Sequence, residues 1–280
     1  METLEQAFLA KYPKNGRILR YFAEANGCEC TWENLTKLRL QKFVTHLSEK
    51  ISPNGVATYC SRFKTVLNIY NEEVSLPRDY EKVLQVKHDN SQHTYLDDED
   101  LNLIIHYKPN GMTEKIIKDW FLIGCLTGAR HSDYVRFSRK NIRDGQLQYV
   151  SIKTHIFASI PVSDMLNKLI LRSEAYNGIT FSDTYFNRII KRICQNAGIT
   201  NVITLYPRGE FKTGEKWEFV GSHTARRSFA TNLYKRGVDI YTISRLCGHS
   251  SIEMTKQYIC CGPIVSDNVI DYFNTFSDDE

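Results

Sequence analysis

Apolar side chains recur every three or four positions through the first third of the chain, a spacing that is typical of amphipathic helices. The pattern predicts helices over residues 4–25, 38–47, 56–70 and 80–86. Pro13 and Gly16 interrupt the first of these stretches, and Thr31 is the expected N-cap of the second. The first part of the chain is therefore predicted to be a set of short packed helices.

The second part of the chain mixes this periodicity with the alternation expected of strands. Asp144-Gly145 is a hairpin signal, so residues 141–161 are predicted to form a small antiparallel sheet with a second turn near Lys153. Alternating aromatic residues and glycines predict another hairpin within residues 203–220. Helices are expected over residues 114–126, 164–174 and 184–197, and again from Ser222 onward. The predicted fold class is mainly α with small antiparallel β elements.

A polar stretch divides the two parts. Residues 87–94 are nearly free of aliphatic side chains, whereas the acidic residues 97–100 that follow suit the first turn of a helix. We therefore predict a helical domain over residues 1–88, a linker over residues 89–95, and a mixed α/β domain over residues 96–280.

Charge is distributed unevenly along a chain whose net charge is only +4. Two basic clusters stand apart from the acidic segments, the first formed by Lys11, Lys14, Arg17 and Arg20, and the second by Arg136, Arg139, Lys140 and Arg143. Such segregation allows one face of a nearly neutral protein to bind DNA. Solvated helix faces would explain either cluster alone equally well.

Several classes of protein are disfavoured by what the sequence lacks. It contains no run of 18 apolar residues, and its N-terminus does not resemble a signal peptide, so we expect a cytoplasmic protein without a membrane partner. The eight cysteines include no pair with the spacing of a zinc site. Reduced structural thiols, no metal and no cofactor are the expectation.

Six residues in a fixed order have the chemistry needed to attack a phosphodiester: Arg130, Lys153, His223, Arg226, His249 and Tyr258. Two guanidinium groups can hold non-bridging oxygens, imidazole and ammonium groups can move protons, and a phenol can become a covalent phosphotyrosine. Asp133 follows Arg130 by three positions, so it is expected on the same helical face as a supporting residue. Each residue taken alone is as well explained by a surface or core position.

The local sequences around these residues resemble those of the tyrosine recombinases, the integrase family of phages and mobile elements. The resemblance rests on Thr127-Gly128-Ala129-Arg130, on His223-Thr224-Ala225-Arg226, and on Leu246-Cys247-Gly248-His249-Ser250-Ser251 with Tyr258 nine residues after His249. Cys247 and Met254 depart from the usual pattern. The match covers about residues 95–265, whereas the first domain resembles the core-site-binding domain of the family only in length and helix count.

The resemblance implies a mechanism. Tyr258 attacks a DNA phosphorus while Arg130 and Arg226 bind its non-bridging oxygens and His249 adds a donor. His223 accepts the phenolic proton, and Lys153 protonates the departing 5′ oxygen. The resulting 3′-phosphotyrosyl link conserves the energy of the bond, so neither ATP nor a metal is needed. Arg227 is expected to point away and to contact DNA backbone or solvent.

The resemblance also implies partners. These are double-stranded recombination sites, a homotetramer on DNA, and accessory proteins that bend DNA or set directionality, with the protein associated with a bacterial nucleoid. Val265, Val269, Ile270, Tyr272, Phe273 and Phe276 form a segment that docks on a neighbouring subunit or packs in its own. Integration or excision of a phage or mobile element is the favoured role. DNA inversion or resolution, a type IB topoisomerase activity and a non-catalytic DNA-binding regulator are the alternatives.

Overall fold

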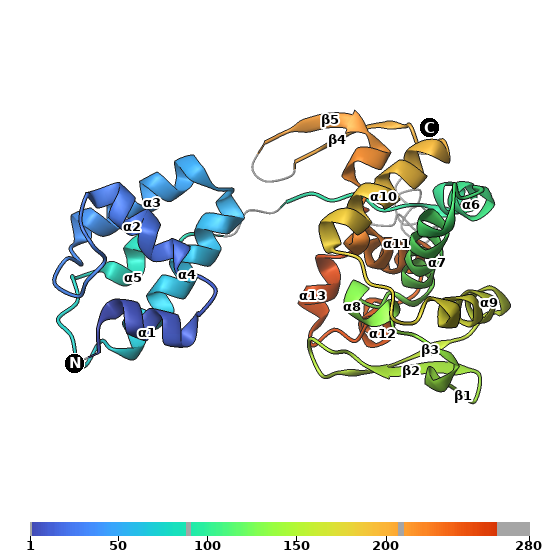
Figure 1. Cartoon of the computed structure of the whole chain (residues 1–280), viewed down its shortest axis with the longest axis horizontal. Helices are drawn as coiled ribbons and strands as arrows, with labels where there is room; N and C mark the ends of the chain where they lie inside the picture. Colours follow the sequence, from blue (N-terminus) through green and yellow to red (C-terminus); the bar gives the residue numbers. More distant parts are fainter. Residues whose placement is uncertain (1, 88–90, 207–209, 262–280) are drawn as a thin grey trace, which may run out of the picture. The chain divides into compact units, whose positions relative to one another are not determined.

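The computed structural model describes residues 2–87, 91–206 and 210–261 (Figure 1). The described chain divides between Ser91 and Gln92 into two compact units, with Tyr206 and Phe211 grouped with the first. The expected docking segment beyond residue 262 and part of the expected linker lie outside the described residues.

The first unit is a packed set of helices. They are α1 (Leu4–Lys11), α2 (Arg17–Asn26), α3 (Lys37–Lys50), α4 (Pro53–Ile69) and the short α5 (Tyr80–Val83). Phe22, Phe43 and Phe63 meet at its centre, with ring centroids 5.9 Å apart for Phe22–Phe43 and 5.5 Å for Phe43–Phe63. Tilted aromatic pairs of this kind stabilise a small core beyond the area that they bury.

The second unit combines most of the remaining helices with two small sheets. Its α-helices are α6 (Asp98–His106), α7 (Met112–Thr127), α8 (His131–Tyr134), α9 (Asp164–Ser173), α10 (Asp183–Asn196), α11 (Ser222–Lys235), α12 (Ile240–Cys247) and α13 (Ile252–Lys256). Single 3₁₀ turns lie at η1 (Arg139–Asn141), η2 (Glu174–Tyr176) and η3 (Lys216–Phe219). The prediction of a mainly helical fold with small antiparallel sheets is confirmed.

The core of the second unit is built around α7, which is buried along most of its length and packs against α9, α10 and α11. Gly124 brings α7 and α11 into close contact, because a Cβ atom there would lie 2.6 Å from the ring of Tyr134 and 2.9 Å from Ala225. Gly128 ends α7 in a left-handed conformation with φ of 63°. The bend turns the next residues toward α11, which positions the first predicted site residue, Arg130.

The larger sheet is antiparallel and consists of β1 (Ile142–Arg143), β2 (Gln146–Val150) and β3 (Phe157–Pro161) in that order. Asp144 and Gly145 both have positive φ, as a two-residue hairpin turn requires. Leu147 faces Ile160 across β2 and β3, and both side chains are buried. The smaller sheet pairs β4 (Val202–Leu205) with β5 (Lys212–Glu215). Both predicted hairpins are therefore present.

One predicted helix cap is wrong. The N-cap of α3 is Thr36, which accepts a hydrogen bond from the backbone of Arg39, and not Thr31. Threonine is a common N-cap, so the sequence could not separate the true cap from the other candidate. The prediction of a helix from Ser222 onward is confirmed, since Ser222 is the first residue of α11.

No helix in the described part of the chain is long and apolar enough to cross a lipid bilayer. All eight cysteines, which reach as far as Cys261, are free thiols.

Candidate active site

Arg226 is the largest fully buried side chain of the described residues, at 1% exposure. Its Nη1 donates to the carbonyl oxygen of Gly128 over 2.7 Å, and its Nε donates to His249 Nε2 over 3.2 Å. Its Nη2 is buried and has no hydrogen-bond partner among the described residues. A buried charged donor without an acceptor is costly, so this nitrogen marks a position that an anionic oxygen would fill.

His249 lies just after the left-handed Gly248 that ends α12, and it is 6% exposed. Because Arg226 donates to its Nε2, the proton of the neutral ring lies on Nδ1, which is 2.9 Å from Thr255 Oγ1. Burial, together with the charges of Arg226 and Arg130, lowers the pKa of His249 to about 3. In this state both ring nitrogens are engaged within the protein, so His249 holds Arg226 in place instead of presenting a free donor.

Arg130 is 6% exposed and precedes α8 directly. Its Nη1 donates to Ser151 Oγ over 3.0 Å and to Thr154 Oγ1 over 3.3 Å. Ser151 in turn donates to Asp133 over 2.9 Å, and the other oxygen of Asp133 accepts from the backbone of Ile152. Asp133 was expected to support Arg130, and the structure shows that the two side chains are linked through the hydroxyl of Ser151.

Tyr258 follows α13 and is half-buried. Its ring centroid is 4.9 Å from that of His249 and 5.1 Å from Arg226 Cζ. Arg227 Cζ lies 5.7 Å from the same centroid, so the expectation that Arg227 points away from the site is wrong. The backbone carbonyl of Tyr258 accepts from Thr231, whereas its phenol forms no hydrogen bond within the described part of the chain.

His223 and Lys153 are the exposed members of the set. His223 is in the first turn of α11, and Lys153 is in the turn between β2 and β3, as predicted. Partial desolvation of the imidazole lowers the pKa of His223, and nearby positive charges, those of Arg227, Arg226, His131 and Lys153, also lower it. A lowered pKa keeps the imidazole neutral and able to accept a proton.

Positive charge dominates this site. Within the described ranges, no carboxylate forms an ion pair with Arg130, Arg226 or Arg227. Burial lowers the pKa of the Arg130 guanidinium, and Arg226 lowers it further, whereas Tyr258 and Asp133 raise it. Clustered cations without counter-ions, next to a phenol, can bind a phosphodiester and stabilise the charge that develops when the phenol attacks it.

Sequence reasoning missed the hydroxyl groups that hold the site together. Ser151 had no signal beyond its place at a strand end, whereas Thr255 could have been inferred from its spacing of six residues after His249. The four basic residues of the first unit are exposed on α1, on α2 or between them, and belong to another unit. Among the described residues, no group of three or more potential ligands could hold a metal ion.

A separate cavity of about 820 Å³ lies in the second unit and contains none of the six predicted catalytic residues. Trp120 and Phe181 line it together with Arg136, Arg139 and Lys140 from the second basic cluster. Arg139 is paired with Glu174 over 2.9 Å.

Comparison with known proteins places this geometry in context. The model of the phage integrase family matches residues 94–261 of this chain. The integrase of Escherichia phage P2 is 26% identical over 252 residues, which cover 88% of this chain and 66% of that protein. The chain spans less than two thirds of the length of the curated relatives that it matches.

Solved structures share the fold. A lambda integrase dimer bound to a COC′ core site superposes with a TM-score of 0.66 at 15% identity, over 95% of this chain and 98% of that chain. A lambda integrase tetramer bound to a Holliday junction superposes with a TM-score of 0.60 at 15% identity, over 90% of this chain and 78% of that chain.

Proposed function

The chain belongs to the phage integrase family, and on this premise we propose that it is a tyrosine site-specific recombinase that cleaves and rejoins DNA through a 3′-phosphotyrosyl link. Integration or excision of a phage or mobile element is the role that its relatives support best. DNA inversion or resolution would use the same chemistry.

The observation that carries the proposal is the unpaired, buried Nη2 of Arg226 beside the ring of Tyr258. A phosphate oxygen would give this nitrogen the acceptor that it lacks. Arg130 would take a second oxygen, since its guanidinium is restrained by Ser151 and Thr154 but pairs with no carboxylate in the part of the chain that the structure describes. The phosphorus between them would then lie within reach of the phenol of Tyr258.

The remaining residues divide the proton transfers. His223 accepts the phenolic proton as Tyr258 attacks, because its lowered pKa leaves the imidazole neutral. Lys153, in the turn after β2, protonates the departing 5′ oxygen. His249 keeps Arg226 oriented through its Nε2 and is itself held by Thr255. The 5′ hydroxyl of a partner strand reverses the reaction and completes the exchange.

The proposal extends to partners. The lambda structures contain DNA core sites and a tetramer on a Holliday junction, and we propose the same partners and assembly here. The first unit, with its exposed basic residues, would bind DNA beside the cleavage point, so the enzyme would work at the nucleoid in the cytoplasm. Accessory proteins that bend DNA would set the direction of exchange.

A type IB topoisomerase would use the same nucleophile and clamp without exchanging strands. One assay separates the two activities, because a recombinase joins two marked duplexes whereas a topoisomerase only relaxes a supercoiled one. We expect recombinant products from a pair of cognate sites.

The proposal is tested with a nicked substrate, from which the cleaved fragment diffuses away and leaves the covalent adduct trapped. Wild-type protein should accumulate the adduct, and Tyr258→Phe should accumulate none while it binds the site with unchanged affinity, because only the attacking oxygen is lost. Tyr241→Phe, at a tyrosine of α12 that is 62% exposed, is the matched control and should behave as wild type. Undiminished cleavage by Tyr258→Phe would overturn the proposal.

A further inference from the structure

A polar stripe runs along α11 on the side away from Arg226. Thr224, Ser228 and Asn232 follow one another at intervals of four and are 2%, 0% and 7% exposed. Arg226 lies two positions from the first two of them, which is about 200° around the helix axis. Buried polar side chains require partners, and the catalytic site does not supply these.

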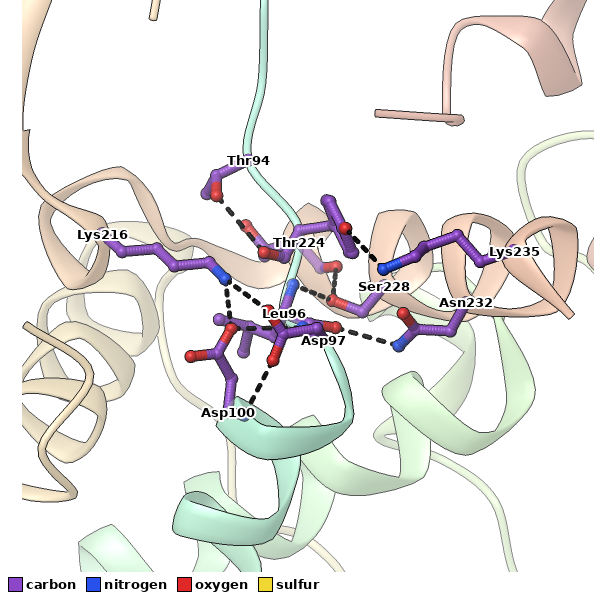
Figure 2. Close-up of polar contacts among 10 residues, drawn as sticks. Thr94, Leu96, Asp97, Asp100, Lys216, Thr224, Ser228, Asn232 and Lys235 are labelled. Atoms are coloured by element: carbon purple, nitrogen blue, oxygen red, sulfur yellow. Dashed lines mark hydrogen bonds and ion pairs between the residues drawn. The ribbon is translucent and has the colours of Figure 1, made fainter. Parts of the chain in front are cut away.

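The partner of Ser228 and Asn232 is the segment through which the chain enters the second unit (Figure 2). Thr224 Oγ1 accepts instead from the N–H of Gly221 over 2.9 Å. The N–H of Leu96 donates to Ser228 Oγ over 2.9 Å, and Asn232 Nδ2 donates to the carbonyl oxygen of Leu96 over 2.9 Å. The hydroxyl of Ser228 donates to the carbonyl oxygen of Thr224 over 2.8 Å. One backbone unit is thus bound on both sides by side chains one helical turn apart, while the Leu96 side chain is buried in the core. We call these contacts the Leu96 latch.

A second anchor holds the residues that follow. Lys216, which is 8% exposed, contacts Asp97 over 3.1 Å and also Asp100. Asp97 and Asp100 form the capping box that begins α6, and Lys216 belongs to η3, shortly before α11. Figure 2 shows Lys216 and Asn232 reaching this segment from opposite sides. The segment is therefore held both by η3 and by the middle of α11.

Upstream of the latch, the segment lies near the catalytic end of α11. Burial, together with the charges of Arg227 and His223, lowers the pKa of His93, three residues before Leu96, to about 4. Ser228 and Asn232, which hold Leu96, belong to the same helix as His223 and Arg226. The latched segment is thus bound to the helix that carries two of the residues that the proposed reaction uses.

We propose that Ser228 and Asn232 are positioning residues for DNA cleavage, which hold the entering segment on α11 and thereby fix Arg226 against the carbonyl of Gly128. This inference rests on the proposed function. Since residues 91–97 also join the first unit covalently to the second, a displacement of the first unit on DNA is transmitted through the Leu96 latch to the helix that carries Arg226 and His223.

The experiment uses the full chain and the nicked substrate, with cleavage measured at saturating protein. Asn232→Asp keeps the shape of the side chain but replaces the donor with an acceptor, and Ser228→Ala removes the hydroxyl. Each variant should bind the site normally and cleave it roughly tenfold to a hundredfold more slowly, as expected when a catalytic group is misplaced by a fraction of its contact distance. Thermal melting confirms that each variant is folded at the assay temperature.

Two comparisons separate positioning from general weakening. Arg236→Gln breaks an exposed ion pair with Asp98, which also links the end of α11 to α6, and should leave the rate unchanged. In an Arg226→Lys background, Asn232→Asp should slow cleavage by less than it does alone, because both changes act on the same group.

Folded Asn232→Asp and Ser228→Ala proteins that cleave at the wild-type rate would overturn the inference. It would also be overturned if Asn232→Asp slowed cleavage by the same factor in the Arg226→Lys background as it does alone. Absence of an adduct with wild-type protein would instead overturn the proposed function.

Discussion

The basic cluster of the first unit lies on its surface, whereas the two arginines of the candidate site lie in the interior of the second unit. Lys11 and Arg20 are exposed and keep their hydration, while Arg130 and Arg226 are only 6% and 1% exposed. Hydrated lysines and arginines occur on most protein surfaces and cost little. Buried guanidinium groups without counter-ions are costly and are retained where an anion is to be bound.

This difference shows which charges can be assigned a chemical role. Arg226 has one free buried nitrogen and two fixed ones, so the structure specifies the direction from which an acceptor must come. The exposed basic residues of the first unit show only that its surface has a positive electrostatic potential there. Substitutions in the second unit should therefore change the rate of cleavage, and substitutions in the first unit should change affinity and its dependence on salt.

The largest of these effects is expected for Arg226→Ala. The variant loses a preorganised donor to the reacting phosphate, so cleavage at saturating protein should fall roughly 10²–10³-fold. Binding should change little, because many phosphate contacts share the affinity. Arg245→Ala, at an exposed arginine of α12, is the control. Near-normal cleavage by folded Arg226→Ala would mean that the buried cluster is not the phosphate site.

A smaller effect is expected for the stability of the site in acid. The pKa of His249 is lowered to about 3 in the folded protein, whereas an unfolded histidine has a pKa of about 6.5. Between pH 6.5 and pH 3, His249 is therefore protonated in the unfolded chain but neutral in the folded protein. The free energy of unfolding consequently decreases as the pH falls from 6.5 toward 3. At pH 4.5 this contribution is lower than at pH 7 by roughly 2 kcal/mol.

His249→Gln isolates this contribution, because glutamine can still accept from Arg226 and donate to Thr255 but cannot titrate. Urea unfolding of both proteins at pH 7 and pH 4.5 should show the smaller acid loss in the variant. Equal losses in the two proteins would show that His249 is not held neutral by its burial beside Arg226.

Ser151→Ala should have a more modest effect on cleavage. The Ser151 hydroxyl links Arg130 to Asp133. When this hydroxyl is removed, Thr154 still restrains the Arg130 guanidinium. A roughly tenfold slower cleavage with normal binding is expected, as for loss of a group that orients a catalytic side chain. Ser159→Ala, on β3 of the same sheet, is the matched control. An unchanged rate would remove Ser151 from the site.

The smallest effect on cleavage is expected in the first unit. Combined Lys11→Gln and Arg20→Gln should weaken DNA binding a few-fold at moderate salt and reduce the slope of log affinity against log salt by about 2. Cleavage at saturating protein should stay at the wild-type rate. A lower rate at saturation, with an unchanged salt slope, would reverse the division of roles between the two units.

The sequence predicted the parts of this structure that depend on local pattern. Apolar periodicity located α7 and α10, and Asp144-Gly145 located the turn between β1 and β2, because such signals act over a few residues. The order of the six polar residues pointed to one site because it matched a family pattern. The structure brings Arg130, Arg226, His249 and Tyr258 together from four separate segments.

The contacts that the sequence did not predict all join distant residues. Neither the hydrogen bond from Arg226 to the carbonyl of Gly128 nor the one from the backbone of Leu96 to Ser228 has a signal in spacing or composition. Arg227 was expected to point outward, yet its position beside Tyr258 depends on how α13 returns to α11. Side-chain direction at such places is decided by packing between segments, which local periodicity does not encode.

The central claim is that the phenol of Tyr258, beside Arg226, forms the bond to DNA, and mapping the trapped adduct tests it most directly. After protease and nuclease digestion, mass spectrometry should find a nucleotide on the peptide that contains Tyr258, and the linkage should be to a 3′ phosphate. Tyr149, Tyr234 and Tyr241 serve as internal comparisons and should carry none. An adduct on another residue, or on a 5′ phosphate, would contradict the account.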